Sequence, residues 1–432
     1  MANNISSSVD IVRIGIILPE DYMTSIKINL YDQHQFSISP DIPFSKNKQM
    51  HVRSEGSELL INNTQSDEFL ISSDSNVEAS FSIHPARTGR GFHWEKFIVL
   101  NLNGNLIIKQ HDGYLFVINE ITLDQYIAGV VLSEMSPDCP SDFILAQTIA
   151  ARSWYLANRR RKHEVLGIDV CNDDCCQRYQ GIDQFTKNFF KVISKASGIV
   201  LTYKDEICDA RYSKCCGGIT ESYENVWQDE SVPYLKSIAD LSGASDQINT
   251  EGLDFNNWIK NAPDANCKPV PNQPKDLIQY LGKVDSEAQY YRWKISYSQA
   301  ELTNIINKKL HLDIQLITKF SINRRGESGR IIDLTLDYID SDQKDQKLQL
   351  TNEYDIRLTL HKKFLYSSAL IIENGPISSG IPDNFIIYGA GWGHGVGLCQ
   401  MGALNLALKG VNYKSILAQY YPGTTLKNLN DN

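Results

Sequence analysis

The 432-residue sequence contains no long apolar run, and no window approaches the length of a membrane-spanning helix. Residues 1–10 have no basic region followed by an apolar run, so no signal peptide is predicted. Positive charge is not in excess either, because 42 Lys and Arg face 51 Asp and Glu, which gives a net charge of −9. This charge argues against nucleic acid or an anionic membrane as the main partner. A neutral or weakly charged polymer such as a glycan remains compatible with it.

The composition is that of a globular protein, with 42% hydrophobic and 22% charged residues. A chain of this length can form two or three domains and bury a large core. Residues 10 to about 120 contain short alternating runs, such as 26–30 and 97–102, separated by Asn, Ser, Asp and Gly. Such runs are typical of strands joined by turns. We therefore expect a β-rich scaffold in this part of the chain.

A short apolar helix with one acid near its end is predicted over Tyr126–Met135. On a helix, Ile127, Val130 and Val131 lie on the same face as Glu134. A carboxyl held against hydrocarbon keeps its proton to higher pH, which is what a general acid near neutral pH requires. The residues alone also allow a Glu134 that points to solvent from the helix end.

A second, longer helix is predicted from about 141 to 161. Leu145, Ile149, Arg152 and Leu156 form one stripe along it. An arginine within an apolar stripe usually has an anionic or hydrogen-bonding partner. Alternatively, its head group reaches the helix edge. Both interpretations of Arg152 stay open.

A possible metal site lies just after this helix. His163, Cys171, Cys175 and Cys176 fall within fourteen residues, and adjacent cysteines in so large a chain are more typical of metal ligands than of a disulfide framework. One His and three Cys can form the closed tetrahedral site of a structural zinc ion. Four protein ligands leave no position for a catalytic water, so the metal would hold a loop. The alternative is a set of buried or disulfide-forming thiols.

Glycines alternate with Trp392, His394 and Val396 over residues 389–397. A strand interior would not tolerate so many glycines, so the backbone must bend there or be closely approached. The spacing is not that of a dinucleotide-binding fingerprint. A histidine framed by glycines and followed by Gln400 is well placed to face a cleft. The Cys215-Cys216-Gly217-Gly218 run is interpreted as a turn, because no spacing supports Cys215 as a nucleophile beside His394.

These stretches resemble the stage II sporulation protein D family, also called the SpoIID/LytB domain. The similarity covers about residues 96 to 425, and the glycine-rich signature is its most specific part. The matching motifs, in order, are 126–135, 146–155, the 163–177 cysteine segment, 217–220, 226–227, 233–236 and 391–403.

The resemblance implies a peptidoglycan lytic transglycosylase, a lyase that cleaves MurNAc-GlcNAc bonds without water and leaves 1,6-anhydro-MurNAc ends. Its substrates would be glycan strands whose stem peptides a cell-wall amidase has removed. Glu134 occupies the position of the family's catalytic acid. The family metal motif commonly has two His and two Cys, and here Cys175 stands where the second His is often found. The resemblance implies substrate contacts for these residues: Arg152, Tyr234, Lys236, His394 and Gln400.

The family also includes amidase enhancers, which implies a second hypothesis: a non-catalytic partner of an amidase or a glycan-binding protein in cell-wall remodelling. A location in the cell envelope or periplasm is expected from the family. A hydrolase using the Cys/His site is disfavoured because that site has no open position. For the fold, we expect an α+β chain with a β-rich region over 1–95 and a mixed α/β catalytic core with a substrate cleft over 96–432, interrupted by an inserted mixed region at about 240–380.

Overall fold

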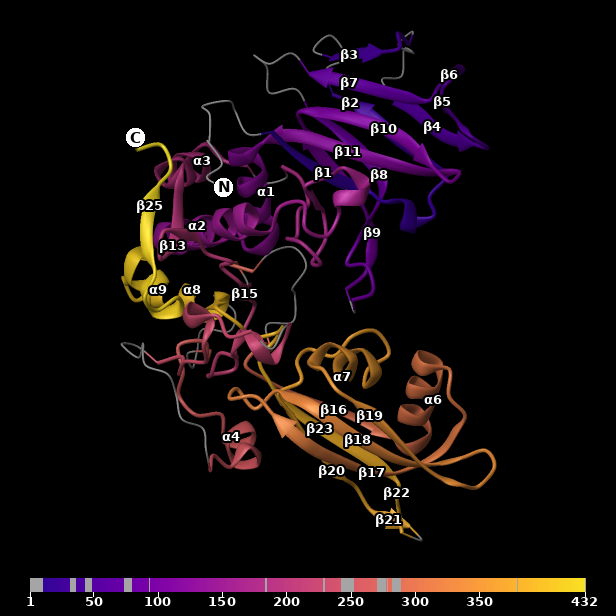
Figure 1. Cartoon of the computed structure of the whole chain (residues 1–432), viewed down its shortest axis with the longest axis vertical. Coiled ribbons are helices and arrows are strands. Elements are labelled where there is room, and N and C mark those ends of the chain that lie inside the picture. Colours follow the sequence, from indigo (N-terminus) through magenta and orange to yellow (C-terminus); the bar gives the residue numbers. More distant parts are fainter. Residues whose placement is uncertain are drawn as a thin grey trace. The chain divides into compact units, whose positions relative to one another are not determined.

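The computed structural model describes residues 11–31, 36–42, 49–73, 80–92, 94–182, 185–227, 230–241, 252–269, 277, 279–281, 289–378 and 380–431 (Figure 1). The prediction that no signal peptide is present concerns residues 1–10, which lie outside these ranges. Within them, no helix combines the length and apolar character needed to cross a membrane.

The described chain forms two compact units. The first contains the described residues up to Pro137 together with Tyr155–Ser197, and the second contains Asp138–Trp154 and the described residues from Gly198 onward. Strands dominate the N-terminal part, and helices alternate with small sheets afterwards. The predicted α+β class with a β-rich N-terminal region is confirmed.

Two six-stranded sheets make up most of the first unit (Figure 1). In one, the strand order is β12–β1–β11–β10–β7–β3, and in the other it is β6–β5–β4–β2–β8–β9. All neighbours are antiparallel except β1 and β12. The strands of the first sheet are β1 (Ile11–Ile17), β3 (Phe36–Ser39), β7 (Glu68–Ser73), β10 (Asn105–His111), β11 (Tyr114–Thr122) and β12 (Val170–Cys171). Those of the second are β2 (Ser25–Leu30), β4 (Gln49–Glu55), β5 (Glu58–Ile61), β6 (Thr64–Ser66), β8 (Ser80–Thr88) and β9 (Lys96–Asn103).

Alternating burial explains why these segments are strands. In β2 and β4, every second side chain is buried, as expected for strands with one face on a core. β11 has a longer buried run. Strands of the two sheets contact each other, β1 with β8 and β11 with β4, so the core lies between the sheets.

Helix α1 (Leu123–Glu134) follows β11 directly. Thr122 caps its N-terminus: the Thr122 hydroxyl accepts from the Gln125 main-chain N–H, and the Gln125 side chain accepts from the Thr122 N–H. The helix predicted over 126–135 is confirmed, and this capping box sets its earlier start. α2 (Ser141–Asn158) ends before the predicted 161, because Arg160 adopts a left-handed conformation and its N–H donates to the Asp169 carbonyl. The first unit also contains α3 (Lys187–Ile193), whereas most of α2 belongs to the second unit.

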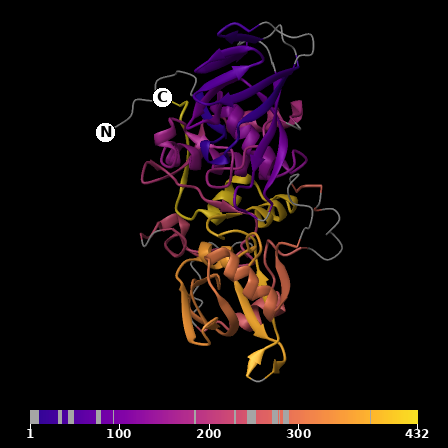
Figure 2. The same ribbon diagram turned by 90° about the vertical axis from the view of Figure 1, so that its right-hand side faces the viewer.

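The second unit contains several small sheets and helices. β16, β23 and β20 form one sheet, β17, β18 and β19 another, and α6 and α7 contact each other and pack on these strands (Figure 1). One continuous hydrophobic cluster, from Trp293 to Ile387, joins them. The hairpin β21–β22 projects from the end of this region (Figure 2). The elements are β16 (Arg292–Ser298), α6 (Gln299–Leu310), β17 (Ile314–Arg325), β18 (Ile331–Asp340), β19 (Asp345–Leu350), α7 (Glu353–Thr359), β20 (Leu370–Asn374), β21 (Ile377–Ser378), β22 (Ile381–Pro382) and β23 (Asn384–Ala390).

The remaining elements of this unit connect segments that are far apart in sequence. β13 pairs with β14 and with the C-terminal β25, and β15 pairs in parallel with β24. The predicted bend of the glycine-rich stretch is present: β23 ends at Ala390, and glycines 391, 393, 395 and 397 all have positive φ. These elements are β13 (Ile199–Tyr203), β14 (Glu206–Ile207), β15 (Tyr212–Ser213), α4 (Phe255–Asn261), β24 (Leu398–Cys399), α8 (Gln400–Leu408), α9 (Tyr413–Tyr420) and β25 (Thr425–Asn428).

Candidate functional site

Glu134 is the last residue of α1, yet only 9% of its surface is exposed. Every residue of the helix from Tyr126 to Glu134 is buried. The carboxyl therefore does not point freely into solvent, although it lies at a helix end. Of the two arrangements that the sequence allows for Glu134, the structure has the enclosed one.

The segment that follows the predicted metal ligands holds α1 in place. Tyr179 packs against Gly129 so closely that a Cβ at this position would lie 2.4 Å from the ring. The main-chain N–H of Gln180 donates to the Ser133 hydroxyl at 2.7 Å. The Tyr126 hydroxyl lies 3.2 Å from Gln177 Oε1. The turns of α1 that precede Glu134 are thus fixed by residues 177–180.

Asp174 is a second acid close to Glu134, and the sequence analysis missed it. Burial raises the pKa of Asp174 to about 7. The positive charge of Arg178 opposes this rise, whereas the charges of Glu134 and Asp173 add to it. Arg178 Nε lies 3.3 Å from Asp174 Oδ1, and its guanidinium lies over the ring of Trp94 at 4.2 Å. Only the fold joins Trp94 to this group, so no local pattern reveals it.

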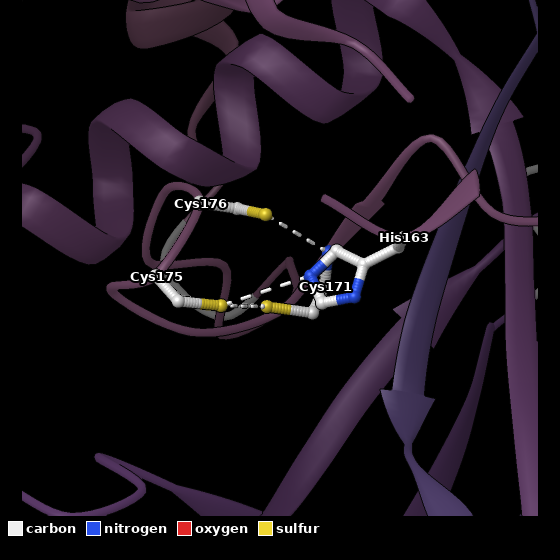
Figure 3. Close-up of side chains that lie close together, drawn as sticks. All are labelled: His163, Cys171, Cys175 and Cys176. Carbon is white, nitrogen blue, oxygen red and sulfur yellow. Dashed lines mark hydrogen bonds between the residues drawn. The ribbon is translucent and has the colours of Figure 1, made fainter. Parts of the chain in front are cut away.

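The side chains of His163, Cys171, Cys175 and Cys176 converge in the first unit (Figure 3). Their candidate ligand atoms all lie within 4.8 Å of one another. The Sγ atoms of Cys171 and Cys175 are 3.0 Å apart, and Cys175 Sγ is 3.7 Å from His163 Nε2. Hydrogen bonds from Cys171 and Cys176, together with His163 and the charge of Lys162, hold the pKa of Cys175 well below its ordinary value. The same contacts raise the pKa of Cys171 and of Cys176, so the cluster favours one thiolate, at Cys175, and the thiolate is the form that binds metal.

This donor set fits a tetrahedral zinc ion. With ordinary Zn–S and Zn–N bonds, two sulfurs should lie about 3.8 Å apart and a sulfur and a nitrogen about 3.6 Å apart. Small side-chain movements would bring the observed separations to these values. The loop is anchored because β12 pairs with β1 and because Asp173 accepts hydrogen bonds from the main-chain N–H groups of Gly89 and Arg90.

His394 lies in the second unit, partly exposed, against Trp227, with 4.8 Å between the ring centroids. Burial lowers the pKa of His394 well below its ordinary value, and the charges of Arg211, Arg330 and Arg357 lower it further. The imidazole is therefore neutral near pH 7. Its Nδ1 accepts from the Val396 N–H at 3.1 Å, which places the ring proton on Nε2.

Tyr234 is joined to His394 by a chain of contacts. The Tyr234 hydroxyl accepts from the Asp209 N–H at 3.0 Å. The Asp209 carboxylate pairs with Arg211, whose guanidinium lies over the Trp227 ring at 4.4 Å. Trp227 is 38% exposed. Two predicted site residues, Tyr234 and His394, are thus connected. The residues that connect them, Asp209, Arg211 and Trp227, were not predicted as site residues.

Lys236 is partly buried and forms an ion pair with Glu224. Arg152 and Gln400 are each only 1% exposed. The Arg152 guanidinium donates to the Ile199 carbonyl at 3.2 Å, and Gln400 is the first residue of α8. Arg152 therefore lies within the fold rather than at the helix edge.

The predicted site residues are divided between the two units. The first unit contains Glu134 and all four predicted metal ligands: His163, Cys171, Cys175 and Cys176. The second contains the predicted substrate contacts: Arg152, Tyr234, Lys236, His394 and Gln400.

Comparison with known proteins gives matches to two family models. Residues 111–203 match the model described as Stage II sporulation protein, and this range includes α1, α2 and the His163/Cys171/Cys175/Cys176 cluster. Residues 221–397 match a model described as a domain of unknown function, DUF8618.

Three relatives show how far the similarity extends. An uncharacterized protein of Brachyspira hyodysenteriae is 27% identical over 328 residues, which cover 76% of this chain and 72% of that protein. The amidase enhancer of Bacillus subtilis is 25% identical over 69% of this chain, and the stage II sporulation protein D of Bacillus amyloliquefaciens is 30% identical over 28%. The match spans only 40% and 39% of the lengths of these last two proteins. Residues 111–203 therefore form a domain of the stage II sporulation protein family, which confirms the resemblance inferred from the motifs in this range.

Proposed function

We propose that the chain is a lytic transglycosylase that acts on peptide-free peptidoglycan glycan strands, with Glu134 as its catalytic residue. The observation that carries the proposal is an enclosed carboxyl at the end of α1, inside the range that matches the Stage II sporulation protein model. The similarity to stage II sporulation protein D and to an amidase enhancer supports a role in cell-wall remodelling.

In the proposed reaction Glu134 acts twice. Its protonated carboxyl donates the proton to the glycosidic oxygen as positive charge develops at C1 of MurNAc. The carboxylate then accepts the proton of the MurNAc 6-hydroxyl as that oxygen bonds to C1. The glycosidic C–O bond breaks, the 1,6-anhydro C–O bond forms, and no water is consumed. One acid is sufficient for this cycle.

A zinc ion at His163, Cys171, Cys175 and Cys176 would support this residue without taking part in the chemistry. The cluster begins the segment whose later residues, Gln177 to Gln180, pack on α1. Loss of the metal would allow that segment to move, and Glu134 would then no longer be held in place. Zinc analysis tests this site: Cys171→Ser should lose about one zinc ion per chain, whereas Cys139→Ser, at a buried cysteine outside the cluster, should lose none.

In the second unit we assign glycan contacts to Tyr234, Lys236 and His394, which retain exposed surface, and His394 packs against the partly exposed Trp227. An aromatic face is a suitable surface for the apolar side of a sugar ring. Arg152 and Gln400 are enclosed, so we assign them the role of holding the elements that carry these contacts.

Digestion of purified, peptide-free glycan strands tests the proposal. Wild-type protein should release fragments with 1,6-anhydro-MurNAc ends, detected by mass spectrometry. Glu134→Gln should lower the rate by at least about 10²-fold, because the amide cannot transfer the proton. The control Glu58→Gln alters an exposed glutamate of β5 in the same unit and should leave the rate unchanged. Reducing ends instead of anhydro ends would contradict the proposal and would point to hydrolysis with Asp174 as the second acid.

The second candidate is a non-catalytic amidase enhancer, which is favoured by the 25% identity to the Bacillus subtilis protein of that description. It predicts no fragments from glycan strands alone, with wild type and Glu134→Gln behaving alike. It also predicts faster release of stem peptides when the chain is added to a cell-wall amidase. Glu134→Gln separates the two functions, because it should abolish only the first.

A further inference from the structure

The second unit contains another group of buried thiols, distant from the first in sequence. Cys216, Cys267 and Cys399 surround Asp240, and one ligand atom from each of these four residues lies within 4.8 Å of the others. All four side chains are buried, and none of the three cysteines forms a disulfide. They belong to different segments: Cys216 lies in the turn after β15 and Asp240 in the loop before α4. Cys267 lies in the loop after α4, and Cys399 is the last residue of β24.

The separations match those of four ligands around one ion. Cys216 Sγ is 3.6 Å from Cys267 Sγ and 3.4 Å from Asp240 Oδ2. A tetrahedral zinc ion with ordinary bond lengths places two sulfurs about 3.8 Å apart and a sulfur and an oxygen about 3.6 Å apart. A disulfide would need the sulfurs at about 2.0 Å. Ligand atoms gathered this closely around one point suit a single ion rather than a cluster of several metal atoms.

The surroundings of Asp240 give independent support. Its Oδ1 accepts from the Tyr420 hydroxyl at 2.6 Å, and its Oδ2 accepts from the Cys267 N–H at 2.9 Å. A Cβ at Gly402 would lie 2.8 Å from Oδ1, so a glycine is required beside the carboxyl. Among the described residues, no Lys or Arg forms an ion pair with this buried carboxylate. A buried carboxylate without a cation is costly, and a metal ion would offset that cost.

Main-chain donors also orient the sulfurs. The N–H of Cys216 points to Cys399 Sγ at 3.2 Å, and the N–H of Gly218 points to Cys216 Sγ at 3.4 Å. Gly217 and Gly218 have positive φ, which lets the turn direct these groups inward. Such donors stabilise thiolates and fix their directions, as the outer shell of a metal site does.

We propose that Cys216, Asp240, Cys267 and Cys399 form a second structural zinc site, separate from the His163 site. Three thiolates and a carboxylate fill a tetrahedral coordination shell and leave no place for a catalytic water. The ion joins the turn after β15 to the start of α8, immediately beyond the glycine-rich segment that carries His394. Its role is to fix this segment, which has few apolar side chains of its own. The inference does not depend on the proposed lytic activity.

Metal analysis of the full chain, purified without chelators, tests the site. Wild type should contain about two zinc ions per chain, Cys267→Ser about one, Cys171→Ser about one, and the double variant none. The control Cys139→Ser changes a buried cysteine of the same unit that lies outside the group, and it should retain both ions. A wild-type chain with one zinc ion, lost entirely in Cys171→Ser, would overturn the proposal.

A second measurement keeps the test decisive if Cys267→Ser does not fold. The Cys171→Ser chain, which retains only the proposed site, is loaded with Co²⁺. It should show sulfur-to-cobalt charge-transfer absorption and the intense visible bands of tetrahedral coordination. Alkylation of wild type under denaturing, non-reducing conditions should modify all nine cysteines. Absence of the cobalt bands, or two unmodified residues among Cys216, Cys267 and Cys399 when the modified positions are mapped, would overturn the proposal, and the latter would assign a disulfide to the group.

Discussion

Glu221 has no exposed surface, and its carboxylate accepts hydrogen bonds from the Asn225 side chain at 2.8 Å and the Ser328 hydroxyl at 2.5 Å. Burial and, after it, a shared hydrogen bond with Glu327 together raise the pKa of Glu221 to about 7. The same pairing lowers the pKa of Glu327. One proton is therefore retained between the two carboxyls over a wide pH range. The main-chain N–H of Glu221 donates to the Gly395 carbonyl, so this pair lies against the glycine-rich segment.

This pair predicts a specific loss of stability with rising pH. Between about pH 4.5 and pH 7, folded Glu221 holds a proton that the unfolded chain has released, so the free energy of unfolding falls as the pH rises. The decrease from this group should reach about 2 to 3 kcal/mol by pH 8. The lowered pKa of Glu327 changes the free energy of unfolding only at pH values below this range.

Urea unfolding of wild type and Glu221→Gln from pH 5 to pH 8 checks the prediction: the free energy of unfolding should fall less steeply with pH in the variant than in wild type. Glu206→Gln, at an exposed position of the same unit, should show the same pH dependence as wild type. An equal pH dependence in wild type and Glu221→Gln would contradict the assignment.

Helix α1 is fixed by one close contact in its middle. Gly129 faces the ring of Tyr179. The Tyr179 ring packs against the ring of Tyr126, with 5.7 Å between the two centroids. The Tyr179 hydroxyl lies 3.3 Å from Asn119 Oδ1. Replacing a glycine inside a helix with alanine ordinarily stabilises the helix by about 1 kcal/mol. Here the added Cβ would meet the ring of Tyr179 at 2.4 Å, and this side chain is fully buried.

Gly129→Ala should therefore destabilise the protein by about 1 to 2 kcal/mol, because overpacking outweighs the gain in helix propensity. Thermal unfolding measures the change. A double variant, Gly129→Ala with Tyr179→Leu, should be no less stable than Tyr179→Leu alone, since the smaller side chain removes the clash. If Gly129→Ala proves as stable as wild type, the helix is not fixed in this way.

Local patterns were sufficient to predict the elements that depend on neighbouring residues. The apolar face of α1 and the His163/Cys171/Cys175/Cys176 cluster are visible in short stretches, because a helix turn or a loop of fourteen residues brings their side chains together. The Cys216 group could not be predicted, since Cys216 and Cys399 are 183 positions apart and only the pairing of β15 with β24 makes them neighbours. For the same reason Asp174 and Trp94 were missed. The sequence does contain one indication of the Cys216 group, because most of its cysteines lie outside the His163/Cys171/Cys175/Cys176 cluster.

The charge of the whole chain leads to a last prediction, about glycan binding. The net charge is −9, and two cations of the second unit already have carboxylate partners: Lys236 pairs with Glu224 and Arg211 pairs with Asp209. Peptide-free glycan strands carry the lactyl carboxylates of MurNAc, so long-range electrostatics do not favour association. The affinity of the full chain for such strands should change by less than about twofold between about 50 and 300 mM salt. Calorimetric titration at both salt concentrations measures it, with a short DNA duplex as the polyanion control that should not bind. A tenfold loss of affinity at high salt would show instead that Lys or Arg side chains bind the substrate carboxylates directly.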